Sequence, residues 1–149
     1  MVTAILPETG PLHLLKMAVG IDTVEHLRQI RAARRAERGG SWVYTRNHPR
    51  RSEAVLAGGS IYWVIRGQVR VRQRITGFRS ERDEHGRRYC QIEVDPVLVP
   101  TLWRPWRPFQ GWRYLLPADA PPDDLYGASA VEAQMPAQML AELRSLGLL

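Results

Sequence analysis

The feature of this sequence that most constrains its fold is a two-residue alternation that runs through residues 60–65 and 68–75. Between the two segments stands the dipeptide Arg66-Gly67. In the first segment, Ile61, Trp63 and Ile65 fall on one face; in the second, apolar side chains and a glutamine alternate with three arginines. Because successive side chains of a strand point to opposite faces, both segments predict strands, and their closeness in the chain favours an antiparallel pair.

Similar patterns along the chain complete an α+β order of elements. Further strands are expected over residues 12–19, 41–46, 88–94 and 112–116, and helices over 22–38, 50–57 and 136–149. The first helix is expected to begin at Asp22 as N-cap, with Glu25 as its capping-box partner, and to end at Gly39. Its core face is expected to carry Val24, Leu27 and Ile30, and its outer face Arg28, Arg31, Arg35 and Arg38. The order predicts a small mixed or antiparallel β-barrel with a β-α-β-α start and a C-terminal helix.

A length of 149 residues predicts one domain. We expect a core over residues 11–116, with an acidic loop and the C-terminal helix of 117–149 packing on it. Cys90 is the only cysteine and is expected in the core, which favours a reducing compartment. The start of the chain lacks a secretory pattern and no segment is long and apolar enough to span a membrane, so a cytoplasmic protein is expected.

The charge of the chain is unevenly distributed. The net charge is +6; residues 1–116 carry +10 and residues 117–149 carry −4. Of the 21 basic residues all but Lys16 are arginine, which donates two parallel hydrogen bonds to a phosphate; a coding bias would produce the same composition. A basic body of this kind favours a polyanionic partner.

The segment "WRPWRPFQG" over residues 103–111 has a period of three. Polyproline II geometry would place Trp103, Trp106 and Phe109 on one edge and Arg104, Arg107 and Gln110 on the next. Two interpretations stay open, and both can hold for different rings. The aromatic rings cover the core, or exposed tryptophans stack on bases while the arginines hold phosphates.

Two more basic groups are candidates for phosphate contacts. Arg70, Arg72 and Arg74 point the same way along one predicted strand, either as a phosphate ladder or as a solvated sheet face paired with acids such as Glu93. Around the turn "TRNHPRR", Arg46, Arg50 and Arg51 precede a short helix; the alternative is a plain basic loop.

Two resemblances add to this interpretation. With "LLKMAVGIDTVEHL", "LAGGSIYWVIRGQVRVRQRI", "RPFQGWRYL" and the terminal "LGLL", the chain resembles an uncharacterised bacterial family of unknown function over nearly its whole length. "LAGGSIYW" and "GQVRVRQ", followed by Asp95-Pro96, are also similar to the PUA-like superfamily and its EVE and ASCH branches, although Ser60 stands where an acidic residue is usual. That second resemblance implies recognition of RNA or of a modified base in an aromatic pocket near Tyr62, Trp63 and Arg46.

No catalytic motif is present in the sequence, and an enzyme is not the favoured interpretation. Histidines and acids are scattered, so neither a metal nor a cofactor is expected; Thr45, Arg46 and His48 form the best available cluster for an enzyme acting on nucleic acid or a nucleotide. The favoured hypothesis is a non-catalytic module that binds RNA in preference to DNA. The alternative is a protein-interaction or assembly module that uses the 103–111 segment and the C-terminal helix. A monomer or weak homodimer without membrane contact is expected.

Overall fold

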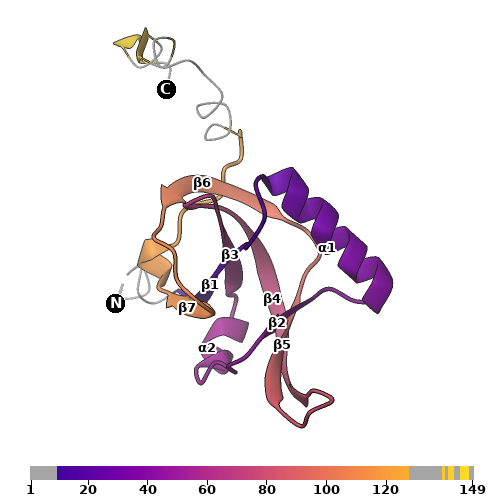
Figure 1. Cartoon of the computed structure of the whole chain (residues 1–149). Helices are drawn as coiled ribbons and strands as arrows, with labels where there is room; N and C mark the ends of the chain where they lie inside the picture. Colours follow the sequence, from indigo (N-terminus) through magenta and orange to yellow (C-terminus); the bar gives the residue numbers. More distant parts are fainter. Residues whose placement is uncertain (1–9, 128–138, 140, 143–144, 148–149) are drawn as a thin grey trace, which may run out of the picture.

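The computed structural model describes residues 10–127, 139, 141–142 and 145–147. Within them lie seven strands, two α-helices and one 3₁₀ helix (Figure 1). In chain order they are β1 His13–Met17, α1 Val24–Arg38, β2 Trp42–Thr45, α2 Ser52–Leu56, β3 Ser60–Ile65, β4 Gln68–Arg82, β5 Arg88–Val94, β6 Val99–Pro105, β7 Trp112–Leu115 and η2 Pro117–Asp119.

The strands form one mixed sheet in the order β2-β5-β4-β3-β1-β7, and β6 also pairs with β4. The β1–β3 pair is parallel and the other pairs are antiparallel. The long strand β4 connects the two ends of the sheet, because it pairs with β3 along residues 68–74 and with β5 along residues 75–82. The α+β class is therefore confirmed. A barrel is not confirmed, because β2 and β7 are the two ends of an open sheet.

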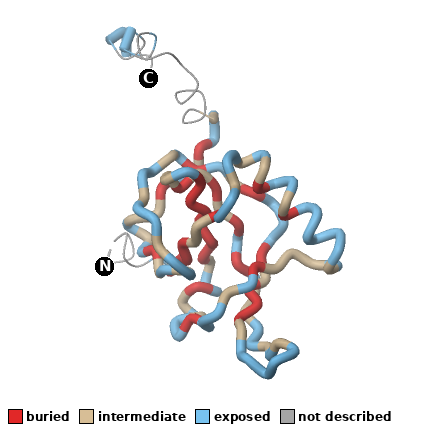
Figure 2. The backbone as a smooth tube through the Cα atoms, viewed as in Figure 1, coloured by how far each residue is buried: buried red, intermediate tan, exposed pale blue. Residues whose placement is uncertain are grey.

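Hydrophobic clusters occupy both faces of the sheet. Figure 2 shows long buried stretches, in red, along the strands in the middle of the molecule. The larger cluster includes Leu14, Ile61 and Ile92 together with Leu27 of α1 and Val55 of α2. The smaller cluster lies on the opposite face, where Leu15, Tyr62 and Leu115 are covered by Trp106, Phe109 and Ala120. The centre of the sheet is therefore covered on both faces, and all six residues of β3 are buried. Except for a few polar groups, the side chains buried there are apolar.

A register shift between Trp63 and Val64 alters the expected alternation of β4. Trp63 pairs with Val71, but Val64 pairs with Val69, so β4 has one residue more than β3 at this point, as in a β-bulge. As a result Val69 packs in the smaller cluster and Val71 in the larger one, although both were expected on one face. Arg70 is the extra residue.

Helix α1 forms where expected but differs in two details. Its N-cap is Thr23 rather than Asp22: the Thr23 hydroxyl accepts a hydrogen bond from the backbone N–H of His26 at 3.0 Å. The His26 ring in turn accepts from the backbone N–H of Asp22 at 3.4 Å, which is the role that we had expected of Glu25. Arg31 does not lie on the exposed face, because only 6% of its surface is accessible.

The 103–111 segment is not polyproline II throughout. Trp103, Arg104 and Pro105 belong to β6, which pairs with β4. Beyond them, Trp106 and Phe109 are half-buried against the smaller cluster. This part of the segment covers the core, as the first interpretation states.

Beyond residue 116 the chain packs back onto the sheet. Residues 121 and 124 are buried, and the chain returns to β6: Leu102 N–H donates to Pro122 O, Asp124 N–H donates to Pro100 O, and Thr101 forms an isolated bridge with Asp123. Most of the predicted C-terminal helix lies outside the described residues. Of its predicted apolar face, Met139 and Leu146 are described and exposed. No helix in the described part of the chain has the length and apolar composition needed to cross a membrane.

Candidate nucleic-acid interface

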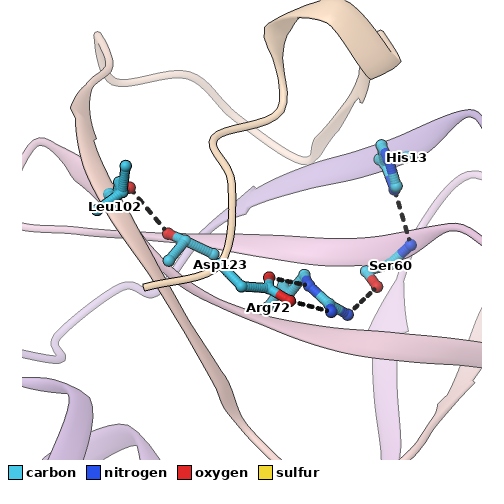
Figure 3. A network of polar contacts seen from close by, with 6 residues as sticks. His13, Ser60, Arg72, Leu102 and Asp123 are labelled. Carbon is cyan, nitrogen blue, oxygen red and sulfur yellow. Dashed lines mark hydrogen bonds and ion pairs between the residues drawn. The ribbon is translucent and has the colours of Figure 1, made fainter. Parts of the chain in front are cut away.

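A network of polar contacts joins β1, β3 and β4 to the segment that follows η2 (Figure 3). The guanidinium of Arg72 donates from Nε and Nη2 to the two carboxylate oxygens of Asp123, both at 2.8 Å, and from Nη1 to Ser60 Oγ at 3.0 Å. Ser60 N–H donates to Nδ1 of His13 at 3.0 Å. The bidentate pair fastens the 117–124 segment to the sheet.

These contacts also set the ionisation of the network. Burial, together with the nearby Arg72 charge, lowers the pKa of His13 from 6.5 to about 4, so this ring is neutral at pH 7 and accepts at Nδ1. The hydrogen bond from Arg72 lowers the pKa of Asp123. Burial raises the pKa of Tyr62, whose ring packs edge-on against His13 at 5.0 Å between centroids. The network thus combines a neutral histidine with an ion pair that holds the 117–124 segment against the sheet.

The predicted arginine ladder of β4 is divided among three environments. Arg70 stacks on Trp103, with its guanidinium carbon 3.9 Å from a ring centroid. Arg72 forms an ion pair with Asp123. Glu93, the acid expected to pair with this row of arginines, lies near Arg79 instead. Arg74 is exposed. The three arginines therefore do not form a regular row of side chains that are free to contact phosphates.

The arginines of the 103–111 segment and its surroundings stack on aromatic rings. Arg104 lies 5.3 Å from the Trp106 ring and Arg113 lies 5.7 Å from the Phe109 ring. Arg104 also donates to the backbone carbonyl of Asp119. Arg107 is exposed.

The two aromatic residues suspected from the PUA-like resemblance are buried. Tyr62 and Trp63 each retain 5% exposure, and Trp63 Nε1 donates to the buried Gln73 side chain at 3.0 Å. Both rings are therefore mostly covered by neighbouring side chains.

The basic turn before α2 is exposed, and two of its donors are hydrogen-bonded within the chain. Arg46 donates from Nη1 to the Arg88 carbonyl at 3.2 Å, and the Arg51 N–H donates to the Tyr114 hydroxyl at 3.0 Å. Arg50 is exposed. Helix α2 spans only five residues, too short to provide an anion site at its N-terminus.

The expected catalytic cluster does not assemble as a unit. His48 Nδ1 lies 3.0 Å from Ser80 Oγ and 3.6 Å from Cys90 Sγ, while Arg46 turns to Arg88. Burial raises the pKa of the Cys90 thiol to about 11, consistent with the core position expected for it. Across residues 10–127, no group of histidine, cysteine and acidic side chains is placed to hold a metal.

The structure shows a surface that the sequence did not reveal, where α1, β2 and β5 meet. Tyr44 and Tyr89 pack edge to face with ring centroids 5.5 Å apart, and the Arg38 guanidinium lies 4.4 Å from the Tyr44 ring. Beside them is a shallow hollow of about 510 Å³ lined by both tyrosines, Thr45, Arg46 and Asp83. We call Arg38, Tyr44, Arg46 and Tyr89 the tyrosine surface. Alternation predicts that Tyr44 is outward, but only the β2–β5 register brings it to Tyr89.

The fold and these sites define an α+β protein whose surface combines arginine and aromatic side chains. The chain belongs to the family described as "Protein of unknown function (DUF1489)", whose model matches residues 14–149. This confirms the first resemblance. No curated protein and no solved structure matches the chain, so the PUA-like resemblance is not confirmed.

Proposed function

We propose that this protein is a non-catalytic module that binds single-stranded RNA on the tyrosine surface. The observation that carries the proposal is the Arg38–Tyr44–Tyr89 stack at the rim of an open hollow. Proteins that bind single-stranded nucleic acids combine aromatic rings with arginines, because bases stack on the rings and guanidinium groups bind phosphates.

The charges around the hollow support an anionic partner. Within the described residues, Arg38 and Arg46 form no ion pair with an acid. The one acid of the hollow, Asp83, already accepts hydrogen bonds from the backbone N–H groups of His85 and Arg87 at 2.9 Å. Its carboxylate therefore stabilises the β4–β5 turn.

Two arginines of the 103–113 region provide a second contact surface in this proposal. Arg107 and Arg113 are exposed and form no ion pair with an acid of the described residues, and the guanidinium of Arg113, stacked on Phe109, keeps its N–H edge available to a phosphate. A PUA-like origin of the fold is part of the proposal, supported by the strand, helix, strand, short helix start.

The test is fluorescence anisotropy of a labelled single-stranded RNA at about 50 and 200 mM salt. We expect Tyr89→Ala to weaken binding by about tenfold, since loss of one stacked base costs on the order of 1–3 kcal/mol. Arg46→Gln should weaken binding and flatten the salt dependence. Tyr126→Ala is the matched control, because Tyr126 is 91% exposed and distant in sequence from the tyrosine surface. Unchanged binding in Tyr89→Ala, or no dependence on salt, would reject the proposal.

A protein-interaction function is the second candidate. It is supported by exposed apolar side chains, among them Val97, Leu116 and Leu125. A concentration-dependent oligomer in light scattering, lost in Leu125→Ser, would favour it; a monomer at all concentrations would count against it.

A further inference from the structure

A second hollow lies beneath α1, where the helix crosses β1, β2 and β3. Its volume is about 250 Å³ and it is more enclosed than the hollow at the tyrosine surface. Its apolar wall includes Leu27, Ile30, Val43 and Trp63, and its cations are Lys16, Arg31 and Arg34. We call it the cation pocket.

The three cations of this pocket form no ion pair within the part of the chain that the structure describes. No acid of the described residues lies within ion-pair distance of Lys16, Arg31 or Arg34. Arg31 is buried, its Nε has no hydrogen-bond partner, and its single side-chain bond is a long one of 3.4 Å to Ser41 Oγ. Lys16 lies on the same face of β1 as the core residue Leu14, so its chain enters the space under the helix rather than the solvent.

Two of these cations, Arg31 and Lys16, are removed from solvent in full or in part, whereas Arg34 is exposed. Burial lowers the pKa of Lys16, and burial with the neighbouring charges of Arg34 and Arg38 lowers the pKa of Arg31 to about 10. Buried charges are normally paired because their desolvation is otherwise uncompensated. An anion in the pocket would supply a partner to Arg31 and Lys16, and the exposed Arg34 lines the same space.

The apolar lining of the cation pocket indicates which chemical group would be attached to the anion. Apolar side chains and the Trp63 ring line the space beside the cations, which suits a ligand with a charged end and a flat apolar body. Tyr44 lines both this pocket and the hollow of the tyrosine surface, so the two spaces adjoin. We propose that the cation pocket binds the phosphate group of a nucleotide, with the base against the apolar wall. The nucleotide is either free or part of an RNA strand; only the second source depends on the function proposed above.

The direct test is calorimetric titration of the whole protein with AMP, inorganic phosphate and adenosine at constant ionic strength. We expect AMP to bind at least tenfold more tightly than phosphate, and adenosine to bind more weakly than AMP by a similar factor. Lys16→Met and Arg34→Gln should each weaken AMP binding by about tenfold. Arg35→Gln is the control, because Arg35 is exposed on the same helix and does not line the cation pocket.

Thermal unfolding separates ligand loss from fold damage. Lys16→Met removes a half-buried charge without a partner, so the unliganded variant should melt at a temperature equal to or above that of the wild type, yet lose the rise that AMP produces. Equal affinity for AMP and phosphate, or AMP binding that Lys16→Met and Arg34→Gln leave unchanged, would overturn the proposal.

RNA titrations identify the source of the nucleotide. If Lys16→Met weakens RNA and AMP binding together, the pocket takes a nucleotide of the strand. If it weakens AMP binding alone, the ligand is a free nucleotide. The Tyr89→Ala variant keeps the two proposals apart, because Tyr89 does not line the cation pocket: failure of the RNA proposal would leave AMP binding intact.

Discussion

At the scale of single residues, the structure reassigns several arginines that the sequence presents as equivalent. Arg72 fastens a loop through Asp123, Arg31 is buried under its own helix, and Arg74 is exposed. The environment of each arginine is set by the residues that surround it in the folded structure, not by the residues next to it in the sequence. An arginine stripe in the sequence is consistent with a phosphate contact, a structural ion pair or a buried cation, and only the partners decide among them.

The Arg72–Asp123 pair predicts a pH-dependent contribution to stability. Because Arg72 lowers the pKa of Asp123 below its ordinary value of 3.8, the stabilisation is fully present above that value and is lost as the pH falls through the lowered pKa. We expect Asp123→Asn to reduce the free energy of unfolding by about 1 kcal/mol at pH 7, a modest figure because both side chains are partly exposed.

Urea denaturation at pH 7 and at pH 2.5 measures this difference. The difference between the two proteins should be smaller at the lower pH. Glu84→Gln, in the exposed β4–β5 turn, is the control and should change little. A constant difference at both pH values would contradict the assignment.

His13 predicts a second pH dependence, in a higher range. Its pKa falls from 6.5 to about 4 on folding, so the unfolded chain binds the proton first as the pH drops. Stability should be complete above pH 6.5 and decline by up to about 3 kcal/mol as the pH approaches 4. His13→Asn keeps an acceptor near the Ser60 N–H and cannot titrate, so its decline over this range should be smaller. Parallel curves for the two proteins would show that another group is responsible.

At the scale of elements, α1 shows how local signals determine where a helix begins only to within a residue. Asp22 and Thr23 are both good N-caps by type, and they are adjacent. The structure selects Thr23, whose hydroxyl reaches His26 N–H, while Asp22 lies 3.3 Å from Arg66 in an exposed ion pair. The helix end was better determined, because Gly39 has φ 74°, a conformation that favours glycine.

The capping assignment is tested by comparing two neighbouring substitutions. Thr23→Ala should lower the free energy of unfolding by about 1 kcal/mol, because a helix N–H loses its acceptor. Asp22→Ala should cost less than half as much, because an exposed ion pair contributes little. Chemical denaturation of both variants measures the order; a larger loss for Asp22→Ala would contradict the assignment.

At the scale of the whole molecule, the chain folds back on itself through residues 117–124. This segment fills part of the smaller cluster with Ala120 and pairs along β6 near Thr101. Two acids of the segment, Asp119 and Asp123, lie beside Arg104 and Arg72, which had been predicted as phosphate contacts. The opposite charges of the two parts of the chain therefore meet within one folded unit.

Truncation measures how far the folded unit extends. A chain that ends at Gly127 keeps every described contact of the 117–124 segment; a chain that ends at Leu116 loses the Arg72–Asp123 pair and the part of the smaller cluster's cover that Ala120 provides. We expect the shorter chain to be less stable by several kcal/mol, or unfolded, since it exposes buried apolar surface and leaves the partly buried Arg72 without its partner. Circular dichroism during urea titration of both chains tests this, and equal midpoints would restore the boundary at residue 116.

The sequence by itself determined the type and order of most elements, because periodicity, glycines and caps act over a few residues: β1, α1, β2, α2, β3, β5 and β7 lie where the patterns predict. Strand β4 begins at residue 68 as predicted but runs on to Arg82, into the residues expected to form the hairpin loop, because it continues as the partner of β5. It did not reveal β6, because the prolines of this segment favour polyproline II. In the structure these residues form a strand, since they pair with β4. Only the tertiary structure decided the bulge at Arg70, the openness of the sheet, the burial of Arg31 and Trp63, and the meeting of Tyr44 with Tyr89. These depend on contacts between residues far apart in the chain, where registers and packing rather than local propensity set the free energy.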